Sequence, residues 1–290
     1  MRYVACVFVA DDSEAGTPGG MPGVERLSVN AAIEYVRELS DTGVSDVLLF
    51  GVPADRGLDR AAAPDAVIPR FLTRAREVFG DEVTLVADIG LSPYSSDGHS
   101  VVMTAAGSPD PAASYDAAGR LAVAFAAAGA HAVAPCLSLP DQVTQVRDAL
   151  GNSPVPVIPY STKFSSAFYG PYRQTVNSPL GAVRKSYQTD HTDIGTGLAQ
   201  LHDDVAAGCD TVIVKPSMLY LDVLAQACAT TDAAVWAYHV SGEYLALLMA
   251  AEHGGMSPQE LFDEYHDAVR RCGAEAVIGY APQYFTRGSA

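Results

Sequence analysis

Lysine is scarce in this sequence of 290 residues, which contains three lysines and fifteen arginines. Because arginine supplies nearly all of the positive charge, each lysine raises the question of why an amine is needed at that position. Lys163 and Lys215 directly follow short apolar runs that predict buried strands. The scarcity of lysine therefore singles out these two residues as candidates for a special role.

Long apolar runs and an excess of positive charge are also absent. No stretch of about twenty apolar residues occurs, so no transmembrane helix is predicted. The net charge of −16 argues against nucleic acid or an anionic membrane surface as a partner, because like charges repel. A small-molecule site remains compatible with this charge, since such a site can be locally basic.

The N-terminus lacks a distinct basic region and a cleavage site, so residues 1–7 predict a first strand rather than a signal peptide.

Cysteine is infrequent and its pattern excludes a local zinc cluster. Widely spaced cysteines without a C-x-x-C pair are typical of reduced thiols, and we therefore expect a cytoplasmic protein. The five cysteines are Cys6, Cys136, Cys209, Cys228 and Cys272.

Short β-rich segments alternate with helical patterns along the chain. Most of the β segments are near-continuous runs of apolar residues, as expected for strands covered on both faces. The predicted strands are Tyr3–Ala10, Asp46–Val52, Val83–Ile89, Ala130–Pro135, Val155–Tyr160, Thr211–Val214, Ala233–Val240 and Ala276–Tyr280. The predicted helical segments are Ser28–Gly43, Asp110–Gly129, Asp141–Gly151, Ile194–Gly208, Met218–Thr230 and Ser257–Gly273. This alternation predicts an α/β fold, a single-domain (β/α)8 TIM barrel over residues 1–290, whereas a doubly wound sheet would more often have fewer strands.

In a parallel barrel, the residues that follow the strands meet at one mouth, where long loops and catalytic residues gather. The long loops predicted there are Asp11–Arg26, Gly90–Ser108 and Ser165–Asp193. Burial disfavours the charged form of a lysine, and a second amine nearby acts in the same direction, so two such lysines are candidates for Schiff-base formation. The alternative is that both are rim lysines paired with carboxylates. The side chains predicted around the mouth are Asp88, Cys136, Lys163, Lys215, Ser241 and Tyr280.

Long motifs surround both lysines. The segment from Lys163 to Arg173 is K-F-S-S-A-F-Y-G-P-Y-R, and the segment from Val214 to Asp222 is V-K-P-S-M-L-Y-L-D. These segments resemble the two lysine motifs of the porphobilinogen synthase family, also called δ-aminolevulinic acid dehydratase. Similar segments cover essentially the whole chain in the order of the family: 20–28, 49–53, 129–135, 238–244 and 278–280.

The resemblance implies a dehydratase that condenses two molecules of 5-aminolevulinate into the pyrrole porphobilinogen, in tetrapyrrole biosynthesis. It implies that Lys215 forms a Schiff base with the substrate in the P site and Lys163 with the substrate in the A site. Ser241 and Tyr280 resemble the residues that bind the P-site carboxylate, and Asp88 resembles the carboxylate near the P-site amino group. Three residues, Arg173, Arg184 and Gln188, resemble the A-site carboxylate binders, a role that suits a planar guanidinium. Lys185, beside Arg184, is expected to be an exposed charge.

The loop that binds metal in the family differs in this chain. Gly90, Ser92 and Ser100 occupy positions at which the family carries zinc-binding cysteines or aspartates. Glycine has no side chain and neutral serine is a poor zinc ligand, so we expect no active-site zinc. Magnesium bound away from the site is left open. Asp97 and His99 are expected to pack the loop rather than to hold an ion.

Two further departures concern the substrate and the assembly. Cys136 replaces a family serine, and Leu137 and Pro140 replace two family aspartates, which should change how a substrate amine is recognised. A shift of register that brings Asp141 into their place is an alternative. The chain also begins almost at its first predicted strand, without the N-terminal arm of the family's octamer. We therefore expect a homo-oligomer smaller than an octamer.

Three hypotheses for function follow. The first is porphobilinogen synthase activity through paired lysine Schiff bases. The second is a diverged family member that condenses or cyclises a related amino ketone in specialised metabolism, and the altered metal loop and amine pocket favour it. The third, a catalytically inactive binding protein, is disfavoured because both lysines and the carboxylate-binding residues are present.

Overall fold

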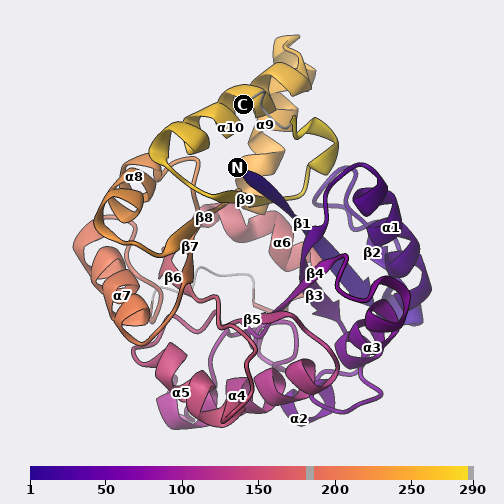
Figure 1. The fold of residues 1–290 in the computed structure, drawn as a ribbon, viewed down its shortest axis with the longest axis vertical. Coiled ribbons are helices and arrows are strands. Elements are labelled where there is room, and N and C mark those ends of the chain that lie inside the picture. The colour runs from indigo at the N-terminus through magenta and orange to yellow at the C-terminus, as the bar shows by residue number, and fades with distance from the viewer. Residues whose placement is uncertain (181–185, 287–290) are drawn as a thin grey trace.

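A computed structural model describes residues 1–180 and 186–286 of the protein. Eight parallel strands form a nearly closed barrel surrounded by helices (Figure 1), in the hydrogen-bonded order β5-β4-β3-β1-β9-β8-β7-β6. The predicted (β/α)8 barrel is therefore confirmed. The strands are β1 (Arg2–Ala10), β3 (Asp46–Val52), β4 (Thr84–Asp88), β5 (Ala132–Ala134), β6 (Tyr160–Lys163), β7 (Thr211–Lys215), β8 (Ala234–Tyr238) and β9 (Ala276–Gly279), with the short β2 (Arg26–Leu27) paired to β1.

The ring closes between β5 and the segment that leads into β6. The backbone N–H of Ile158 donates to Val133 O at 2.9 Å, and that of Tyr160 donates to Pro135 O at 3.0 Å. The strand predicted at 155–160 instead begins at Tyr160 and runs to Lys163. The prolines in this segment have no N–H to donate, so regular pairing starts only after the last of them.

Helices cover the outside of the barrel. The six predicted helices are present, and the structure adds four: α2, α3, α6 and α9. The helix α3 includes Pro69 in its first turn, where the missing N–H removes no helical hydrogen bond. The ten helices are α1 (Val29–Asp41), α2 (Leu58–Ala61), α3 (Val67–Phe79), α4 (Pro111–Ala127), α5 (Gln142–Leu150), α6 (Gly170–Thr175), α7 (Ile194–Ala206), α8 (Leu221–Thr230), α9 (Ser241–Gly254) and α10 (Pro258–Cys272), all within the described residues.

The strands bury both of their faces, which accounts for their near-continuous apolar runs. On β1, Val4 and Phe8 point into the barrel, whereas Ala5 and Val7 point outward and pack with the apolar faces of the helices. Aromatic side chains fill much of the interior, including Tyr160 from β6. The barrel is therefore a packed core, and polar chemistry is confined to its mouth.

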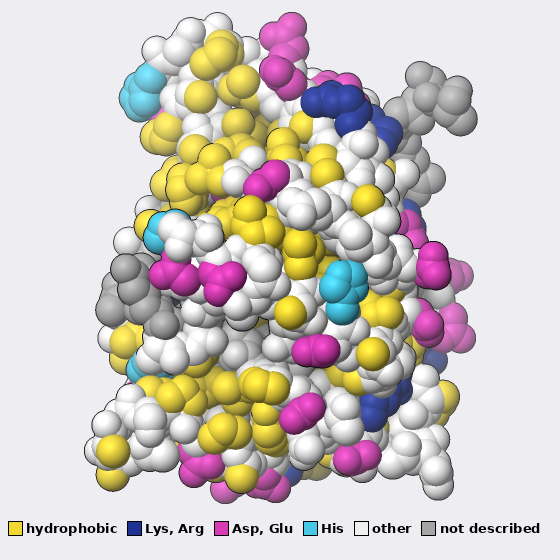
Figure 2. Space-filling model, turned by 90° about the vertical axis from the view of Figure 1, so that its left-hand side faces the viewer, with side chains coloured by type: hydrophobic (Ala, Val, Ile, Leu, Met, Phe, Trp, Pro, Cys, Tyr) yellow, Lys and Arg dark blue, Asp and Glu magenta, His cyan; other side chains and the backbone are white. Residues whose placement is uncertain are grey.

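Acidic side chains are scattered over the face drawn in Figure 2, whereas Lys and Arg side chains gather at a few places. This distribution agrees with the net charge of −16 and offers no broad basic surface on that face. In the part of the chain that the structure describes, no helix is both long and apolar enough to cross a bilayer.

Candidate active site

Lys163 ends β6 and Lys215 ends β7, and the two residues are partners in the parallel register of these strands. Both side chains are buried, with exposed fractions of 4% and 7%. Neither amine forms an ion pair with a carboxylate of a described residue; their contacts are with sulfur, oxygen and aromatic rings. The alternative that both are rim lysines paired with carboxylates is therefore wrong.

Aromatic rings surround the amine of Lys215. Its Nζ lies 3.9 Å from the centroid of the Tyr238 ring and 4.7 Å from that of Tyr160. The rings of Tyr169 and Tyr172 lie slightly farther away, at 5.6 Å and 5.7 Å. Ring faces attract a cation, but burial dominates and lowers the pKa of Lys215 to about 8, with the charge of Lys163 acting in the same direction. About a tenth of this amine is therefore neutral at pH 7, far more than for an ordinary lysine, and the neutral form is the one that can act as a nucleophile.

The amine of Lys163 lies in a different, more polar environment. Its Nζ donates to the backbone oxygen of Cys136 at 2.8 Å and contacts the Sγ of the same residue at 2.9 Å. The Oγ of Ser100 accepts at 3.4 Å. Residues of the loop after β4 and of the loop after β5 thus both contact Lys163, as predicted for side chains that meet at one mouth of the barrel.

Asp88 ends β4 and is almost fully buried. One carboxylate oxygen accepts from the hydroxyl of Tyr160 at 2.7 Å, and the other accepts from the backbone N–H of Gly90 at 2.8 Å. Burial raises the pKa of Asp88, whereas the Tyr160 hydroxyl and the charge of Lys215 oppose this shift. Asp88 is therefore a fixed carboxylate beside the amine of Lys215.

The two residues expected to bind the P-site carboxylate lie on neighbouring elements. Ser241 begins α9, and its Oγ accepts from the backbone N–H of Tyr172 at 3.0 Å and donates to Phe168 O at 3.2 Å. Tyr280 follows β9, and its hydroxyl lies 3.0 Å from that of Tyr238. Burial raises the pKa of Tyr280, so its hydroxyl remains a proton donor.

The residues expected to bind the A-site carboxylate are described only in part, because Arg184 and Lys185 lie outside the described residues. Arg173 lies in α6 and is buried. Gln188 is 4% exposed, and its amide nitrogen and oxygen have no hydrogen-bond partner among the described residues. The backbone of Thr189 pairs with residues 164 and 165, which holds this amide beside the end of β6.

The loop after β4 does not fit a zinc ion. Within the described residues, no group of three His, Cys, Asp or Glu side chains could hold a metal. A Cβ at Gly90 would lie 2.9 Å from Asp88 Oδ1 and 3.0 Å from Cys136 Cβ, so a cysteine at this position would force both groups to shift. Asp97 Oδ1 accepts from the backbone N–H of His99 at 2.9 Å, as expected for residues that pack the loop.

The structure of the loop after β5 excludes the shift of register that would bring Asp141 into the site. Asp141 is exposed at the N-terminus of α5, so it does not return to the site in place of the lost aspartates. Leu137 is fully buried, and its backbone N–H donates to the side chain of Gln142 at 3.2 Å. The pocket around the amines has therefore lost these charges without local compensation from Asp141.

Sequence reasoning did not single out the tyrosines around Lys215 or the hydrogen bond from Tyr160 to Asp88. Three of them lie within segments that resemble the family's motifs, namely Tyr169, Tyr172 and Tyr238. A high local density of tyrosine near the lysine motifs was the available signal. Their proximity to one amine depends on the barrel, because they come from three separate segments.

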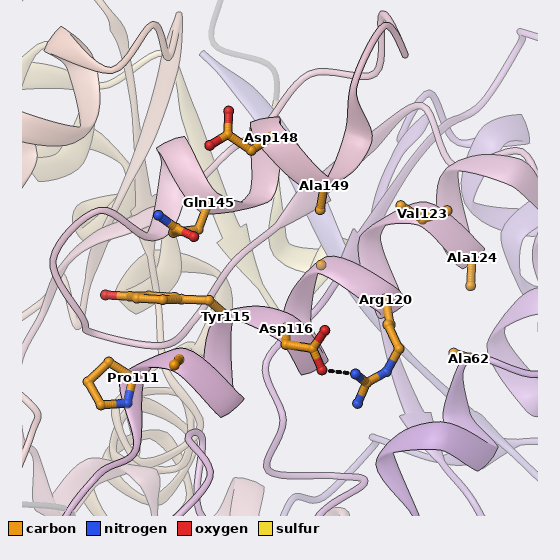
Figure 3. Close-up of a pocket in the computed structure, with 12 residues that line it drawn as sticks. Ala62, Pro111, Tyr115, Asp116, Arg120, Val123, Ala124, Gln145, Asp148 and Ala149 are labelled. Carbon is orange, nitrogen blue, oxygen red and sulfur yellow. Dashed lines mark hydrogen bonds and ion pairs between the residues drawn. The ribbon is translucent and has the colours of Figure 1, made fainter.

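A groove on the outside of the barrel, with a volume of about 970 Å³, contains neither lysine. It lies between α4 and α5 (Figure 3), with Tyr115 and Arg120 on one side and Gln145 on the other. Arg120 is paired with Asp116 within the groove. Since both buried lysines and Asp88 lie at the barrel mouth, we place the candidate active site there and not in this groove.

Two buried, register-paired lysines at the mouth of a parallel barrel, beside a fixed carboxylate, are the arrangement expected of a TIM-barrel enzyme that forms Schiff bases. A family model described as Delta-aminolevulinic acid dehydratase matches residues 1–287. The chain belongs to the δ-aminolevulinic acid dehydratase family.

Individual relatives agree with this assignment. The delta-aminolevulinic acid dehydratases of Streptomyces coelicolor and Mycobacterium tuberculosis are each 34% identical to this chain, over 96% of it and 87% of their own length. The crystal structure of the Toxoplasma gondii ME49 enzyme in complex with the product porphobilinogen matches with a TM-score of 0.93 and 31% identity, covering 99% of this chain and 88% of that one. A dihydropteroate synthase from Yersinia pestis, at a TM-score of 0.53 and 13% identity, shares the fold alone.

Proposed function

We propose that this chain condenses two molecules of 5-aminolevulinate into porphobilinogen through Schiff bases on Lys163 and Lys215. The observation that carries the proposal is the pairing of two buried amines in one strand register. Each amine can hold one ketone, and adjacent strands hold the two ketones side by side. The names of the relatives and the bound product of the Toxoplasma gondii enzyme support the choice of substrate and product.

At the P site, the neutral amine of Lys215 attacks the substrate ketone, and water leaves as the imine forms. The aromatic rings around Nζ exclude bulk water and stabilise the protonated imine, which carries a positive charge. Tyr280 and Ser241 donate hydrogen bonds to the substrate carboxylate, for which the Ser241 hydroxyl must turn from Phe168 O. Asp88 accepts a hydrogen bond from the substrate amino group.

At the A site, Lys163 holds the second ketone. The buried guanidinium of Arg173 and the amide of Gln188 bind its carboxylate, because a planar guanidinium and an N–H donor match carboxylate oxygens. Arg184 is assigned to the same role by resemblance. One C–N bond and one C–C bond then join the substrates, two waters are lost in total, and both lysines are released unchanged.

We propose that this chemistry proceeds without an active-site zinc ion. The support is the steric conflict that a side chain at Gly90 would meet and the absence of thiol ligands at Ser92 and Ser100. No step above is assigned to a metal. Polarisation of the A-site ketone must therefore come from residues of the chain.

A related amino ketone is the second candidate substrate. Cys136 lies beside the amine of Lys163 at a position where the family carries serine, and the next residue, Leu137, is a buried apolar side chain where the family carries aspartate. Both changes reduce the polar groups available to a substrate amine. A substrate with a less polar substituent would tolerate these changes. The lysines would form the same imines with it.

Borohydride trapping distinguishes these functions. The protein is incubated with 5-aminolevulinate, reduced, and analysed by peptide mass spectrometry at Lys163 and Lys215, while porphobilinogen is assayed in parallel. Adducts at both lysines together with product support the proposal. Adducts without product favour the related amino ketone, and the absence of an adduct with any amino ketone contradicts the Schiff-base mechanism.

Two further expectations concern where the enzyme is located in the cell and how many subunits it contains. We propose a cytoplasmic enzyme, supported by five cysteines that form no disulfide bond in the structure. A homo-oligomer smaller than an octamer remains a prediction, which sedimentation velocity of the purified protein tests directly.

A further inference from the structure

Cys136 is the only titratable side chain among the described residues that lies within hydrogen-bond distance of the amine of Lys163. Its Sγ is 2.9 Å from Nζ, and its backbone oxygen accepts from the same Nζ at 2.8 Å. The other side-chain contact is the Ser100 hydroxyl, which does not ionise in the physiological pH range. Asp88 is occupied by Tyr160 and Gly90.

A buried network holds Cys136 in this position. The backbone N–H of the next residue, Leu137, donates to Gln142 Oε1 at 3.2 Å, and Gln142 Nε2 donates to Asp204 at 3.1 Å. Gln142 is fully buried. Ser138 adopts the left-handed conformation, with φ of 59°, which is unfavourable for a residue other than glycine. A strained loop maintained by buried hydrogen bonds is typical of a preorganised functional group.

The thiol has space beside Lys163 because position 90 is glycine. A Cβ there would lie 3.0 Å from Cys136 Cβ and 3.7 Å from its Sγ. Gly90 therefore lacks the metal-binding side chain of the family on the side of the site where the Cys136 sulfur contacts the Lys163 amine. The two departures from the family are therefore neighbours in space.

We propose that Cys136 is a catalytic residue, the acid–base catalyst for Schiff-base formation at Lys163. This inference rests on the proposed function only in requiring that a ketone binds at Lys163. The charged or titratable groups that face the pair are Asp88 from β4, Tyr160 from β6 and Lys215 from β7. None of these three is in hydrogen-bond contact with Lys163 in the described structure.

The step balances without a metal or an additional reagent. The neutral amine attacks the ketone, the Cys136 thiol protonates the resulting alkoxide, and the thiolate takes a proton from the nitrogen, which leaves a neutral carbinolamine. The thiol then protonates the hydroxyl group, the C–O bond breaks, and water leaves. The nitrogen lone pair forms the C=N bond, so the products are a protonated imine, a thiolate and one water.

The test compares adduct formation at Lys163 and Lys215 within each of three variants, using 5-aminolevulinate and borohydride. In Cys136→Ala, the rate of labelling at Lys163 should fall about 100-fold, the usual contribution of general acid–base catalysis. Labelling at Lys215 in the same protein should be unchanged, which reports an intact fold. Cys136→Ser preserves the shape and should also be slow, because a serine hydroxyl is a much weaker acid than a thiol. Cys228→Ser, a partly exposed cysteine on α8, is the matched control and should behave as wild type.

Labelling of Lys163 at the wild-type rate in Cys136→Ala, or full rescue by Cys136→Ser, would overturn the inference. Absence of any Lys163 adduct in the wild-type protein would overturn it as well. If imines form at both lysines of the wild type without porphobilinogen, the proposed substrate pair fails. The comparison at Lys163 then still decides the role of Cys136.

Discussion

Lys163 and Lys215 are register partners at the ends of the adjacent parallel strands β6 and β7. Neighbouring strands are about 4.8 Å apart, so two ketones held on these amines are within reach of one another. The barrel thereby converts a reaction between two dissolved molecules into one between two groups of fixed position. This pairing accounts for a condensation, whereas a single lysine would account only for an isolated imine.

The first prediction concerns the nucleophile. Lys215→Ala should abolish formation of porphobilinogen, by at least about a thousandfold, while leaving the fold intact, because no other amine can form the P-site imine. Lys215→Arg is the matched control that keeps a positive charge without an amine able to form an imine, and it should be equally inactive. Steady-state assays and circular dichroism measure both properties. Normal turnover by either variant would show that Lys215 is not the nucleophile.

The second prediction concerns the stability cost of that amine. Burial lowers the pKa of Lys215 from 10.5 to about 8, so between these values the unfolded chain binds a proton that the native protein has lost. Stability should therefore rise with pH across this window, and the full cost should remain below pH 8. Lys215→Met should be more stable than wild type by about 1–3 kcal/mol at pH 7, because the buried amine is gone.

Urea unfolding at pH 7 and pH 10 measures this difference. The advantage of Lys215→Met should shrink at the higher pH, because the native amine is neutral there and the wild-type protein no longer carries the full cost of burying its charge. An equal or lower stability of the variant at pH 7 would mean that the ring contacts of the ammonium outweigh its desolvation.

The barrel and the positions of its two lysines could be predicted from the sequence, because apolar runs and the residues that follow them are local signals. The hydrogen bond from Tyr160 to Asp88 could not be predicted in this way. Tyr160 and Lys163 are three residues apart, so regular alternation along a strand would place them on opposite faces. A shift of register between Tyr160 and Thr162 adds a residue on β6, and both side chains reach the mouth. A single sequence carries no clear signal for such a bulge.

The third prediction concerns the hydrogen bond from Tyr160 to Asp88. In Tyr160→Phe, the carboxylate keeps only the backbone N–H of Gly90 as a donor, so the pKa of Asp88 should rise further above its ordinary value. A hydrogen bond to a charged group contributes about 1.5–3 kcal/mol, which corresponds to a loss of about 10–100-fold in kcat/KM. The loss should be greatest at low pH, where the carboxylate becomes protonated. Tyr284→Phe, near the C-terminus, is the control in the same kcat/KM profiles, and identical profiles for the two variants would contradict this role.

The fourth prediction concerns metal. Treatment of the wild-type protein with 1,10-phenanthroline should leave its activity unchanged, because the positions of the family's ligands carry Gly90, Ser92 and Ser100. Gly90→Cys should destabilise the protein by about 1–3 kcal/mol through overpacking against Asp88 and Cys136, without creating a zinc requirement.

Ser96→Cys, at an exposed position of the same loop, is the matched control and should leave stability unchanged. Elemental analysis and thermal unfolding measure the two effects. Activity that is lost on chelation and restored by zinc would contradict the proposal of a metal-free site.

Glu243 illustrates a second limit of sequence reasoning, because its role depends on segments that meet only in the fold. This buried side chain accepts from the backbone N–H groups of Val240 at 3.0 Å, Met218 at 2.9 Å and Leu219 at 3.2 Å. It thereby joins the loop that follows Lys215 to the start of α9. Its contact with Val240 is local, at the start of the same helix, but no local pattern identifies the contacts with Met218 and Leu219, which lie on a loop distant in the sequence.

The fifth prediction follows from the titration of this carboxylate. Burial raises the pKa of Glu243 from 4.5 to about 7, although the backbone donors oppose the shift, so the native protein binds more protons than the unfolded chain between these values. Its contribution to stability should therefore decline as pH rises from 4.5 to 7 and stay constant above. Glu243→Gln cannot titrate, so the stability difference between wild type and this variant should decline by about 1–3 kcal/mol across that window.

Urea unfolding of both proteins at pH 5, 6, 7 and 8 measures the difference directly, and other titrating groups such as Asp204 cancel in the comparison. Glu252→Gln, an exposed glutamate on the same helix, is the matched control and should show a flat difference. A flat difference for Glu243→Gln as well would mean that its backbone donors hold the carboxylate charged throughout. In that case Glu243 would fix the loop after Lys215 equally at every pH tested, and the activity of the enzyme would not depend on its protonation.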